Sequence, residues 1–188
     1  MAAELMYVQG IGGTTLDDVM VASGASKSQF YRHFADKEAL VRAVIEHVGA
    51  HVITRETNML GNVSTLAGLR RWRDALVKAN ALRHGMYGCA LGSLAGEVAD
   101  HDAVARSMLD ELFVAWQRLL EGALYRLQQT GVLDDSVDTS RLAVGFLASL
   151  QGGYLLAQTA RDVEPMVIAI DVALAHLESL STPGRAAS

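Results

Sequence analysis

The 188-residue chain lacks the features of disulfide-rich, disordered and membrane-spanning proteins. It has one cysteine, Cys89, which excludes an intramolecular disulfide framework and fits a reducing compartment. Two prolines, and 20% charged against 51% hydrophobic residues, are typical of a packed helical protein rather than a disordered one. No apolar run reaches the ~20 residues of a membrane span, and no segment resembles a signal peptide. We therefore expect a cytoplasmic protein.

Recognisable catalytic and metal-binding motifs are also missing. The sequence has no phosphate-cradling glycine loop, no His-Glu-x-x-His and no nucleophile or carboxylate set with a known catalytic spacing. His47 and His51 lie one helical turn apart, but no third ligand with a suitable spacing accompanies them. We predict that the chain is not an enzyme and that it holds no metal and no cofactor.

Apolar residues recur at helical spacing along nearly the whole chain, and no sustained alternation of period two is present. This pattern predicts an all-α fold of about nine helices. Glycines, N-capping residues and Pro165 indicate where the helices begin and end. We expect a helix at residues 2–9, two short helices between residues 15 and 34, and further helices at 37–58, 65–84, 93–99, 102–130, 140–160 and 165–180.

Residues 14–40, TTLDDVMVASGASKSQFYRHFADKEAL, have the form of a helix-turn-helix. Phe30 and Phe34 lie one turn apart and would bury the inner face of the second helix. Successive helical residues are rotated by about 100°, and the residues that therefore project outward or sideways are Ser28, Gln29, Tyr31 and Arg32, with Lys27 at the exposed N-terminal end. That face is small, polar or cationic, as is required of a helix that enters the major groove of DNA.

Positive charge is concentrated on the same segment. The whole chain carries a net charge of −5, which argues against non-specific binding to polyanions. Residues 26–37 nevertheless hold Lys27, Arg32 and Lys37 against one acid, Asp36, a local charge of +2. Any DNA-binding surface of this chain is therefore expected here.

The helix-turn-helix segment resembles the DNA-binding domain of the TetR family of regulators. The match comprises TT-x-x-D at residues 14–18, Gly24, Ser26-Lys27, FYRHF at 30–34 and KE-x-L at 37–40, and it extends into the long helix. The resemblance implies a dimer whose C-terminal domain binds a small molecule and thereby releases operator DNA. It predicts a DNA-binding domain at residues 1–46, a ligand-binding and dimerisation domain at 47–181 and a flexible tail at 182–188.

The same resemblance assigns the DNA contacts. The residues expected to contact or position phosphates are Thr15, Ser26, Tyr31, His33 and Lys37. Those expected at the base-reading end are Lys27, Ser28 and Gln29. Arg32, on the outward face, completes the predicted set.

The C-terminal part is rich in large side chains that could line a site between helices, the usual location for small ligands in helical bundles. Each of these residues could equally be core. Four polar residues interrupt apolar stripes and could orient a ligand: Arg73, Asn80, Gln117 and Gln151. For a mostly apolar effector, the predicted ligand-binding set is Trp72, Arg73, Met86, Tyr87, Cys89, Met108, Leu112, Phe113, Trp116, Gln117, Phe146 and Gln151.

The last two helices are predicted to form the dimer interface. One recognition helix reads too few base pairs for adequate specificity, so a DNA-binding reading requires a dimer. The residues could instead pack within one chain. The predicted interface consists of Leu142, Phe146, Leu150, Gly153, Tyr154, Val167, Ile170, Leu174 and Leu177.

Two alternatives and one further question stay open. The family usually carries a basic arm before its first helix, whereas this sequence opens almost inside that helix, so either the start is truncated or the arm is absent. Together with the acidic net charge, this motivates a helical protein-interaction adaptor as an alternative. Cys89 precedes a short helix, where thiolate character is raised, so the chain could sense electrophiles or oxidants, although it has no second cysteine to resolve an oxidised thiol. The predicted role is that of a transcriptional repressor, and an activator stays open.

Overall fold

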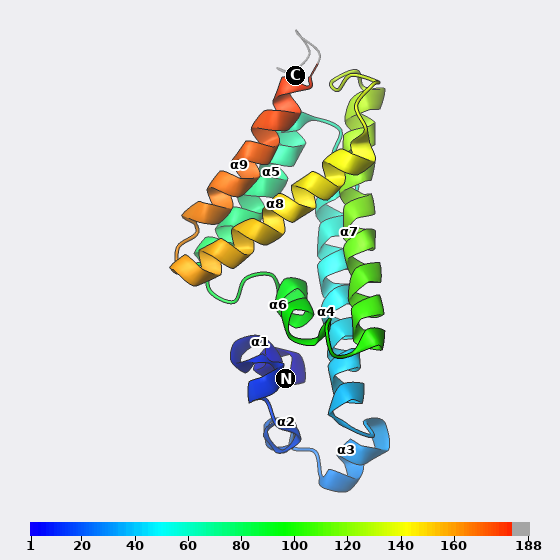
Figure 1. The fold of residues 1–188 in the computed structure, drawn as a ribbon, viewed down its shortest axis with the longest axis vertical. Coiled ribbons are helices and arrows are strands. Elements are labelled where there is room, and N and C mark those ends of the chain that lie inside the picture. Colours follow the sequence, from blue (N-terminus) through cyan, green and yellow to red (C-terminus); the bar gives the residue numbers. More distant parts are fainter. Residues whose placement is uncertain (182–188) are drawn as a thin grey trace. The chain divides into compact units, whose positions relative to one another are not determined.

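The computed structural model describes residues 1–181, and the regular elements in this range are all helices, with no β-strand among them (Figure 1). The predicted all-α class of about nine helices is confirmed. The expected tail at 182–188 lies outside the described residues. The helices are α1 (Ala2–Gly13), α2 (Leu16–Ser23), α3 (Lys27–His33), α4 (Lys37–Leu60), α5 (Leu66–Ala81), α6 (Ala90–Val98), α7 (Ala103–Gln129), α8 (Thr139–Ala160) and α9 (Glu164–Ser179).

Two helix boundaries differ from expectation for a physical reason. The first helix does not end at Gln9, because Gly10 takes a positive φ of 78° and the chain then makes a further helical turn to Gly13. Glycine adopts this conformation without steric cost. The short α6 begins at Ala90 rather than at Ser93, with Cys89 as its N-cap.

The chain divides into two compact units, which we describe separately. The first consists of residues 1–52 and 89–113, and the second of residues 53–88 and the chain from Val114 onward. The predicted DNA-binding domain, residues 1–46, lies within the first unit, which also contains α6 and the start of α7. Helices α4 and α7 each run through both units.

In the first unit, the start of α4 supplies much of the core. Its buried side chains are Leu40, Val41, Val44 and Ile45. Gly49 allows α7 to approach α4 closely, since an added Cβ would lie 2.5 Å from the Leu112 side chain. Arg42 of α4 pairs with Asp102, which precedes α7, at 2.9 Å.

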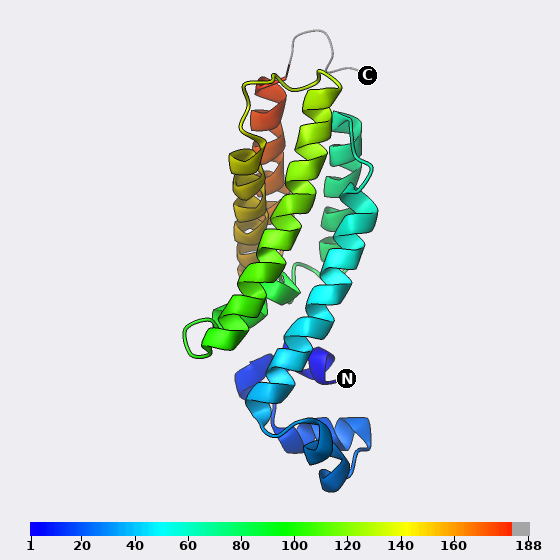
Figure 2. The ribbon, with the colours of Figure 1, turned by 90° about the vertical axis from the view of Figure 1, so that its right-hand side faces the viewer.

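In the second unit, α8 packs against α9, and α5 also contacts α9 (Figure 1). A Cβ at Gly153 would meet the Met166 Cα at 3.0 Å, so glycine permits the close approach of α8 to α9. Helices α4 and α7 run side by side (Figures 1 and 2). Arg126 near the end of α7 donates to the carbonyl oxygens of Leu60 and Val63, which follow from the end of α4. None of the helices in residues 1–181 is both long and apolar enough to cross a membrane.

Candidate nucleic-acid interface

Helix α3 begins with a capping box. The Ser26 Oγ accepts from the Gln29 N–H at 3.3 Å, and the Gln29 Oε1 accepts from the Ser26 N–H at 2.9 Å. These bonds satisfy two backbone donors that the start of a helix leaves unpaired. This capping box fixes where the seven-residue helix begins.

Helix α2 begins with a second capping box, in which Thr15 is fully engaged. The Asp18 N–H donates to the Thr15 Oγ1 at 3.1 Å, while the Thr15 N–H and hydroxyl both donate to the Asp18 Oδ2, at 2.9 and 2.6 Å. The Thr15 hydroxyl first, and then its N–H, lower the pKa of Asp18 below its ordinary value. A phosphate contact from the Thr15 hydroxyl would therefore have to break a bond to Asp18. The Ser26 Oγ accepts in its capping bond, so its proton can still be donated to a phosphate oxygen.

The two faces of α3 differ as the sequence indicates. Phe30 is 4% exposed and its ring centroid lies 5.4 Å from that of Phe34. Tyr31 is 45% exposed, and its ring stands edge-on to Phe30 at 5.6 Å, which holds the aromatic ring in place. Lys37 at the start of α4 is half-buried. The other predicted DNA-contacting residues are exposed: Thr15, Ser26, Lys27, Ser28, Gln29, Arg32 and His33.

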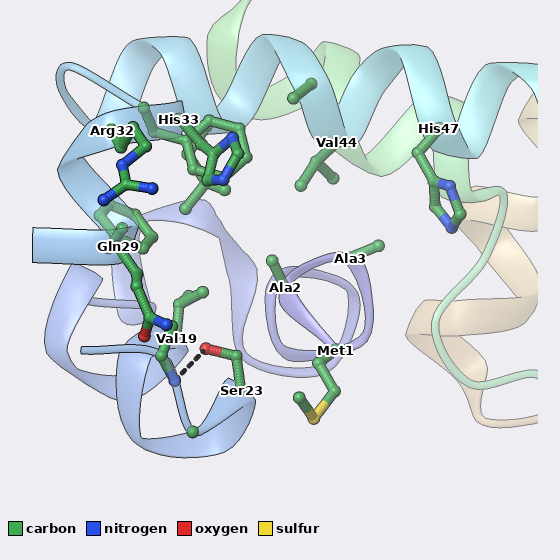
Figure 3. Close-up of a pocket in the computed structure, with 16 residues that line it drawn as sticks. Met1, Ala2, Ala3, Val19, Ser23, Gln29, Arg32, His33, Val44 and His47 are labelled. Atoms are coloured by element: carbon green, nitrogen blue, oxygen red, sulfur yellow. Dashed lines mark hydrogen bonds between the residues drawn. The ribbon is translucent and has the colours of Figure 1, made fainter. Parts of the chain in front are cut away.

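A pocket of about 680 Å³ lies among the start of α1, α2, α3 and the start of α4 (Figure 3). Gln29, Arg32 and His33 line it together with Val44 and His47 of α4. The remaining lining residues are Met1, Ala2, Ala3, Val19, Ser23, Gly24, Ala25, Phe30, Phe34, Leu40 and Ala43. Lys27, Ser28 and Tyr31 are not among them. The predicted DNA-contacting residues of α3 therefore include some that border this pocket and some that do not.

Helix α6 holds the kink in α1. The Glu97 Oε2 accepts from the backbone N–H groups of Ile11 and Gly12 at 2.7 and 3.2 Å, and a Cβ at Gly10 would approach the same oxygen to 3.1 Å. Sequence analysis missed Glu97. No motif marks it, and the groups it joins lie far apart along the chain, so only the three-dimensional structure relates them.

The predicted ligand-binding residues fall in both units. Cys89, Met108, Leu112 and Phe113 belong to the first unit, and Cys89 is buried there. The members in the second unit are Trp72, Arg73, Met86, Tyr87, Trp116, Gln117, Phe146 and Gln151. A common site for the whole set stays a prediction.

Two members of that set are engaged within the second unit. The Trp72 Nε1 donates to the buried carboxylate of Glu56 at 2.8 Å. The guanidinium of Arg73 pairs with Asp171 of α9 at 2.7 Å, which raises the pKa of Arg73. Arg73 therefore joins α5 to α9. An effector that bound Arg73 would have to compete with Asp171.

The residues predicted for the dimer interface are mostly used inside the chain. Leu142 and Val167 are half-buried, and the others are buried: Phe146, Leu150, Gly153, Tyr154, Ile170, Leu174 and Leu177. The sequence left intrachain packing open, and the structure uses these side chains in that way. Both helices are apolar on more than one face. The exposed large apolar residues on them are Val144, Leu155, Leu156, Ile168 and Val172.

Within residues 1–181, no group of three or more His, Cys, Asp and Glu side chains could hold a metal ion. His47 and His51 do lie together, with ring centroids 4.4 Å apart. The His51 Nδ1 lies 2.8 Å from the His47 carbonyl oxygen.

Comparison with known proteins gives the same result for both ends of the chain. Residues 1–44 match the family model of bacterial regulatory proteins of the tetR family. Residues 65–172 match the model of the C-terminal domain of LmrA/YxaF-like transcriptional regulators.

Individual relatives agree with these matches. An HTH-type transcriptional regulator from the lacX 3' region of Lactococcus lactis is 28% identical over 182 residues, covering 94% of this chain and 89% of the relative. The HTH-type transcriptional repressor DhaR of a Mycobacterium species is 24% identical, covering 87% and 81%. The crystal structure of a TetR transcriptional regulator from Chloroflexus aurantiacus superimposes with a TM-score of 0.83 at 24% identity, covering 96% and 91%.

Proposed function

Because the chain belongs to the TetR family of transcriptional regulators, we propose that it is a ligand-responsive repressor. It binds palindromic operator DNA as a homodimer in the cytoplasm, and a small, mostly apolar effector releases it. The observation that carries the proposal is α3, a capped helix whose inner face is anchored by Phe30 while Lys27, Ser28 and Tyr31 are exposed.

The outer face of α3 has the chemistry that DNA binding needs. Lys27 and Ser28 lie in the first turn of the helix, where side chains reach base edges when a recognition helix enters the major groove. Tyr31 and Ser26 offer hydroxyl donors, and Lys37 a cation, for the phosphates on either side. Gln29 keeps its side-chain nitrogen for a base, because its Oε1 accepts from Ser26.

An operator selected from a random duplex library provides the first test. Lys27→Ala and Tyr31→Phe should each weaken operator binding by about tenfold or more, since a lost contact of this kind is worth about 1–3 kcal/mol. The matched controls are Lys78→Ala and Tyr125→Phe, which change residues of the same types in the second unit. Equal affinities of the α3 variants and their controls would refute the assignment, and failure to enrich any DNA would favour the adaptor.

The repressor role is supported by the relative DhaR, whose name describes a transcriptional repressor. A reporter gene whose promoter overlaps the selected operator tests this role. Expression of the protein should lower reporter output, and Lys27→Ala should restore it. A rise in output with the wild-type protein would instead identify an activator.

For the dimer, we propose the outward face of α8 and α9 in place of the buried residues. It presents Val144, Leu155, Ile168 and Val172, and Gly145 and Gly152 lie on the exposed side of α8. A Cβ added at either glycine would meet nothing within 4 Å, so this surface can be approached closely. Exposed apolar side chains around small residues suit a self-complementary four-helix interface.

Two glycine substitutions test that face. Gly152→Arg places a long charged side chain on it, and the open space around Gly152 means that the monomer need not rearrange. We expect monomers in sedimentation velocity and weak operator binding. Gly96→Arg on α6 is the control, because Gly96 is equally unobstructed but lies outside α8 and α9. Dimers formed by Gly152→Arg would reject this interface.

Release of DNA requires that the effector change the first unit. Helices α4 and α7 are continuous through both units, so a shift of either helix in the second unit would also move its part in the first unit. Within the first unit, Glu97 of α6 holds the N–H groups at the α1 kink. We propose that effector binding alters these restraints and so moves the recognition helices away from successive major grooves, which lie about 34–36 Å apart.

A further inference from the structure

We infer that the effector is an uncharged molecule that presents a carboxamide, or a group with the same hydrogen-bond donors and acceptors, to Asn80, Trp116 and Gln151. This inference rests on the proposed function, because it describes the ligand that would switch the protein. It names the polar group that the effector must carry.

Each of these residues has a buried polar atom with no hydrogen-bond partner in the described part of the chain. The atoms are the Asn80 Oδ1, the Trp116 Nε1 and the Gln151 Nε2. Asn80 is 5% exposed and Trp116 is 0% exposed. A buried polar atom that has given up water without gaining a partner lowers stability, and native proteins retain few of them. Three such atoms in one unit therefore point to a partner that comes from outside the chain.

The three residues lie on helices whose ends meet. The Arg126 Nε in α7 donates to the carbonyl oxygen of Val63, just before α5 begins, at 2.8 Å. The Gln128 Nε2 donates to the carbonyl oxygen of Val137, just before α8 begins, at 2.7 Å. The end of α7 and the starts of α5 and α8 are therefore at one end of this bundle.

The distance from that shared end places the three polar residues at one level. We compare the distance along each helix from this shared end to the polar residue. Asn80 is counted from the first residue of α5, Trp116 from the last residue of α7 and Gln151 from the first residue of α8. With a rise of about 1.5 Å per residue, these separations are roughly 21, 20 and 18 Å along the helices. The three residues therefore lie at one level of this bundle, which is the arrangement that a single small ligand group would require.

The other tryptophan of this unit shows that a buried indole can find a partner here. The Trp72 Nε1 donates to the Glu56 carboxylate at 2.8 Å, and Trp72 is as buried as Trp116. The unpaired indole at Trp116 is therefore a property of its position. It is not a general consequence of burying tryptophan in this fold.

The polar groups define the chemistry of the ligand. An indole N–H only donates, so the ligand must bring an acceptor oxygen to Trp116. The amides of Asn80 and Gln151 can each donate or accept, and a group with both functions satisfies them in either orientation. A carboxamide is the simplest such group.

The ligand group must also be uncharged. Among the described residues of the second unit, the buried charged side chain is Glu56, and Trp72 and Arg55 already bind it. An ionic group at Trp116 would therefore be buried without a counter-charge, which is unfavourable. One turn away on the same helices lie the buried side chains of Leu76, Leu120 and Leu147, so the rest of the ligand should be apolar.

Nuclear magnetic resonance of ¹⁵N-labelled dimer tests this inference without DNA. The chain has two tryptophans, so two indole N–H signals are expected, and Trp116→Phe assigns them. The probes are matched amides, carboxylates and hydrocarbons: benzamide, benzoate and isopropylbenzene, with the equivalent naphthyl and biphenyl sets. The amide should move the Trp116 signal downfield and leave the Trp72 signal in place. It should bind about tenfold tighter than its hydrocarbon, and Trp116→Phe should reduce that preference.

Two results would overturn the inference. One is the absence of an amide preference in all three series, and the other is a preference that Trp116→Phe leaves unchanged. The two failures can be told apart. If only the ligand inference is wrong, the ligand-free protein still binds its operator. If the proposed DNA-binding function is wrong, the protein binds no operator, whatever the indole signals show.

A second measurement needs no ligand. Gln151→Leu replaces the unpaired amide with an apolar side chain of similar size, so the melting temperature of the ligand-free protein should stay the same or rise. A clear drop in melting temperature would show that the amide already has a partner in the free protein and would contradict the inference.

Discussion

The two buried tryptophans allow the energetic argument to be tested with one substitution made at two positions. Trp72 and Trp116 are 2% and 0% exposed, so Trp→Phe removes the same atoms from an equally buried site in each case. Both variants lose packing. Only Trp72→Phe also removes a hydrogen bond, the one from the indole to the carboxylate of Glu56, which is fully buried.

The difference between the variants can be estimated. A hydrogen bond to a charged group contributes about 1.5–3 kcal/mol, and its loss leaves the Glu56 carboxylate with Arg55 as its recorded partner. Removal of the unpaired donor of Trp116 has no such cost. Trp72→Phe should therefore be less stable than Trp116→Phe by about 2–3 kcal/mol. For a chain of this size, that corresponds to a melting temperature lower by about 4–12 °C.

The assay is thermal and urea unfolding followed by far-ultraviolet circular dichroism. Protein concentration must be held constant, because the melting temperature of the proposed dimer would depend on it. Adding Glu56→Gln to Trp72→Phe should recover part of the loss, since the carboxylate that lost its donor is then uncharged. Equal destabilisation by the two tryptophan substitutions would refute the reasoning, because it would mean that the Trp72 bond contributes nothing or that Trp116 is also paired.

Three further predictions concern the first unit. Lys37→Ala should weaken binding to all DNA sequences alike and reduce the slope of log affinity against log salt by about one, as expected for one phosphate contact; an unchanged slope would place Lys37 away from the backbone. Glu97→Gln should leave operator binding intact but reduce the factor by which the effector weakens that binding. Titrations of the operator with and without effector measure this factor, and an unchanged factor would mean that α6 plays no part in release. Backbone N–H groups, first that of Ala105, and the Arg42 guanidinium lower the pKa of Asp102 below its ordinary value, so its contribution to stability is present above that ordinary value and is lost as the pH falls through the lowered one. Asp102→Asn should therefore destabilise the protein at pH 7, and urea unfolding at several pH values should show the difference from wild type closing on the acid side.

Much of the fold could be predicted because its signals are local. A capping box joins residues three apart, so Thr15 with Asp18 and Ser26 with Gln29 could be identified from the sequence, and both boxes are present. Helices with one apolar stripe were equally accessible. The boundary of α1 was not, because Gly10 interrupts the helix without ending it.

The interface on α8 and α9 could not be located in the same way. Both helices carry apolar residues on two faces, and periodicity alone does not say which face meets the same chain. The apolar pattern predicts a dimer contact for large residues such as Leu150 and Ile170, but these side chains fill the interior of the unit, while Val144 and Val172 are exposed. That choice depends on which side of each helix the other helices of the unit cover.

Whether a buried polar group finds a hydrogen-bond partner also depends on residues far away in the sequence. The unpaired groups are those that matter for the proposed function. Nothing near Trp72 or Trp116 in the sequence indicates that the first indole N–H binds Glu56, whereas the second has no hydrogen-bond partner among the described residues. A ligand shifts an equilibrium only by its difference in affinity for the two states. Hydrogen bonds to Asn80, Trp116 and Gln151 can supply such a difference if the geometry that accepts the ligand is disfavoured when DNA is bound. A coupling of about 1–3 kcal/mol, which corresponds to a roughly 5–150-fold loss of operator affinity, is within what a few buried hydrogen bonds provide. The unpaired atoms that lower the stability of the free protein would then be those through which the effector acts.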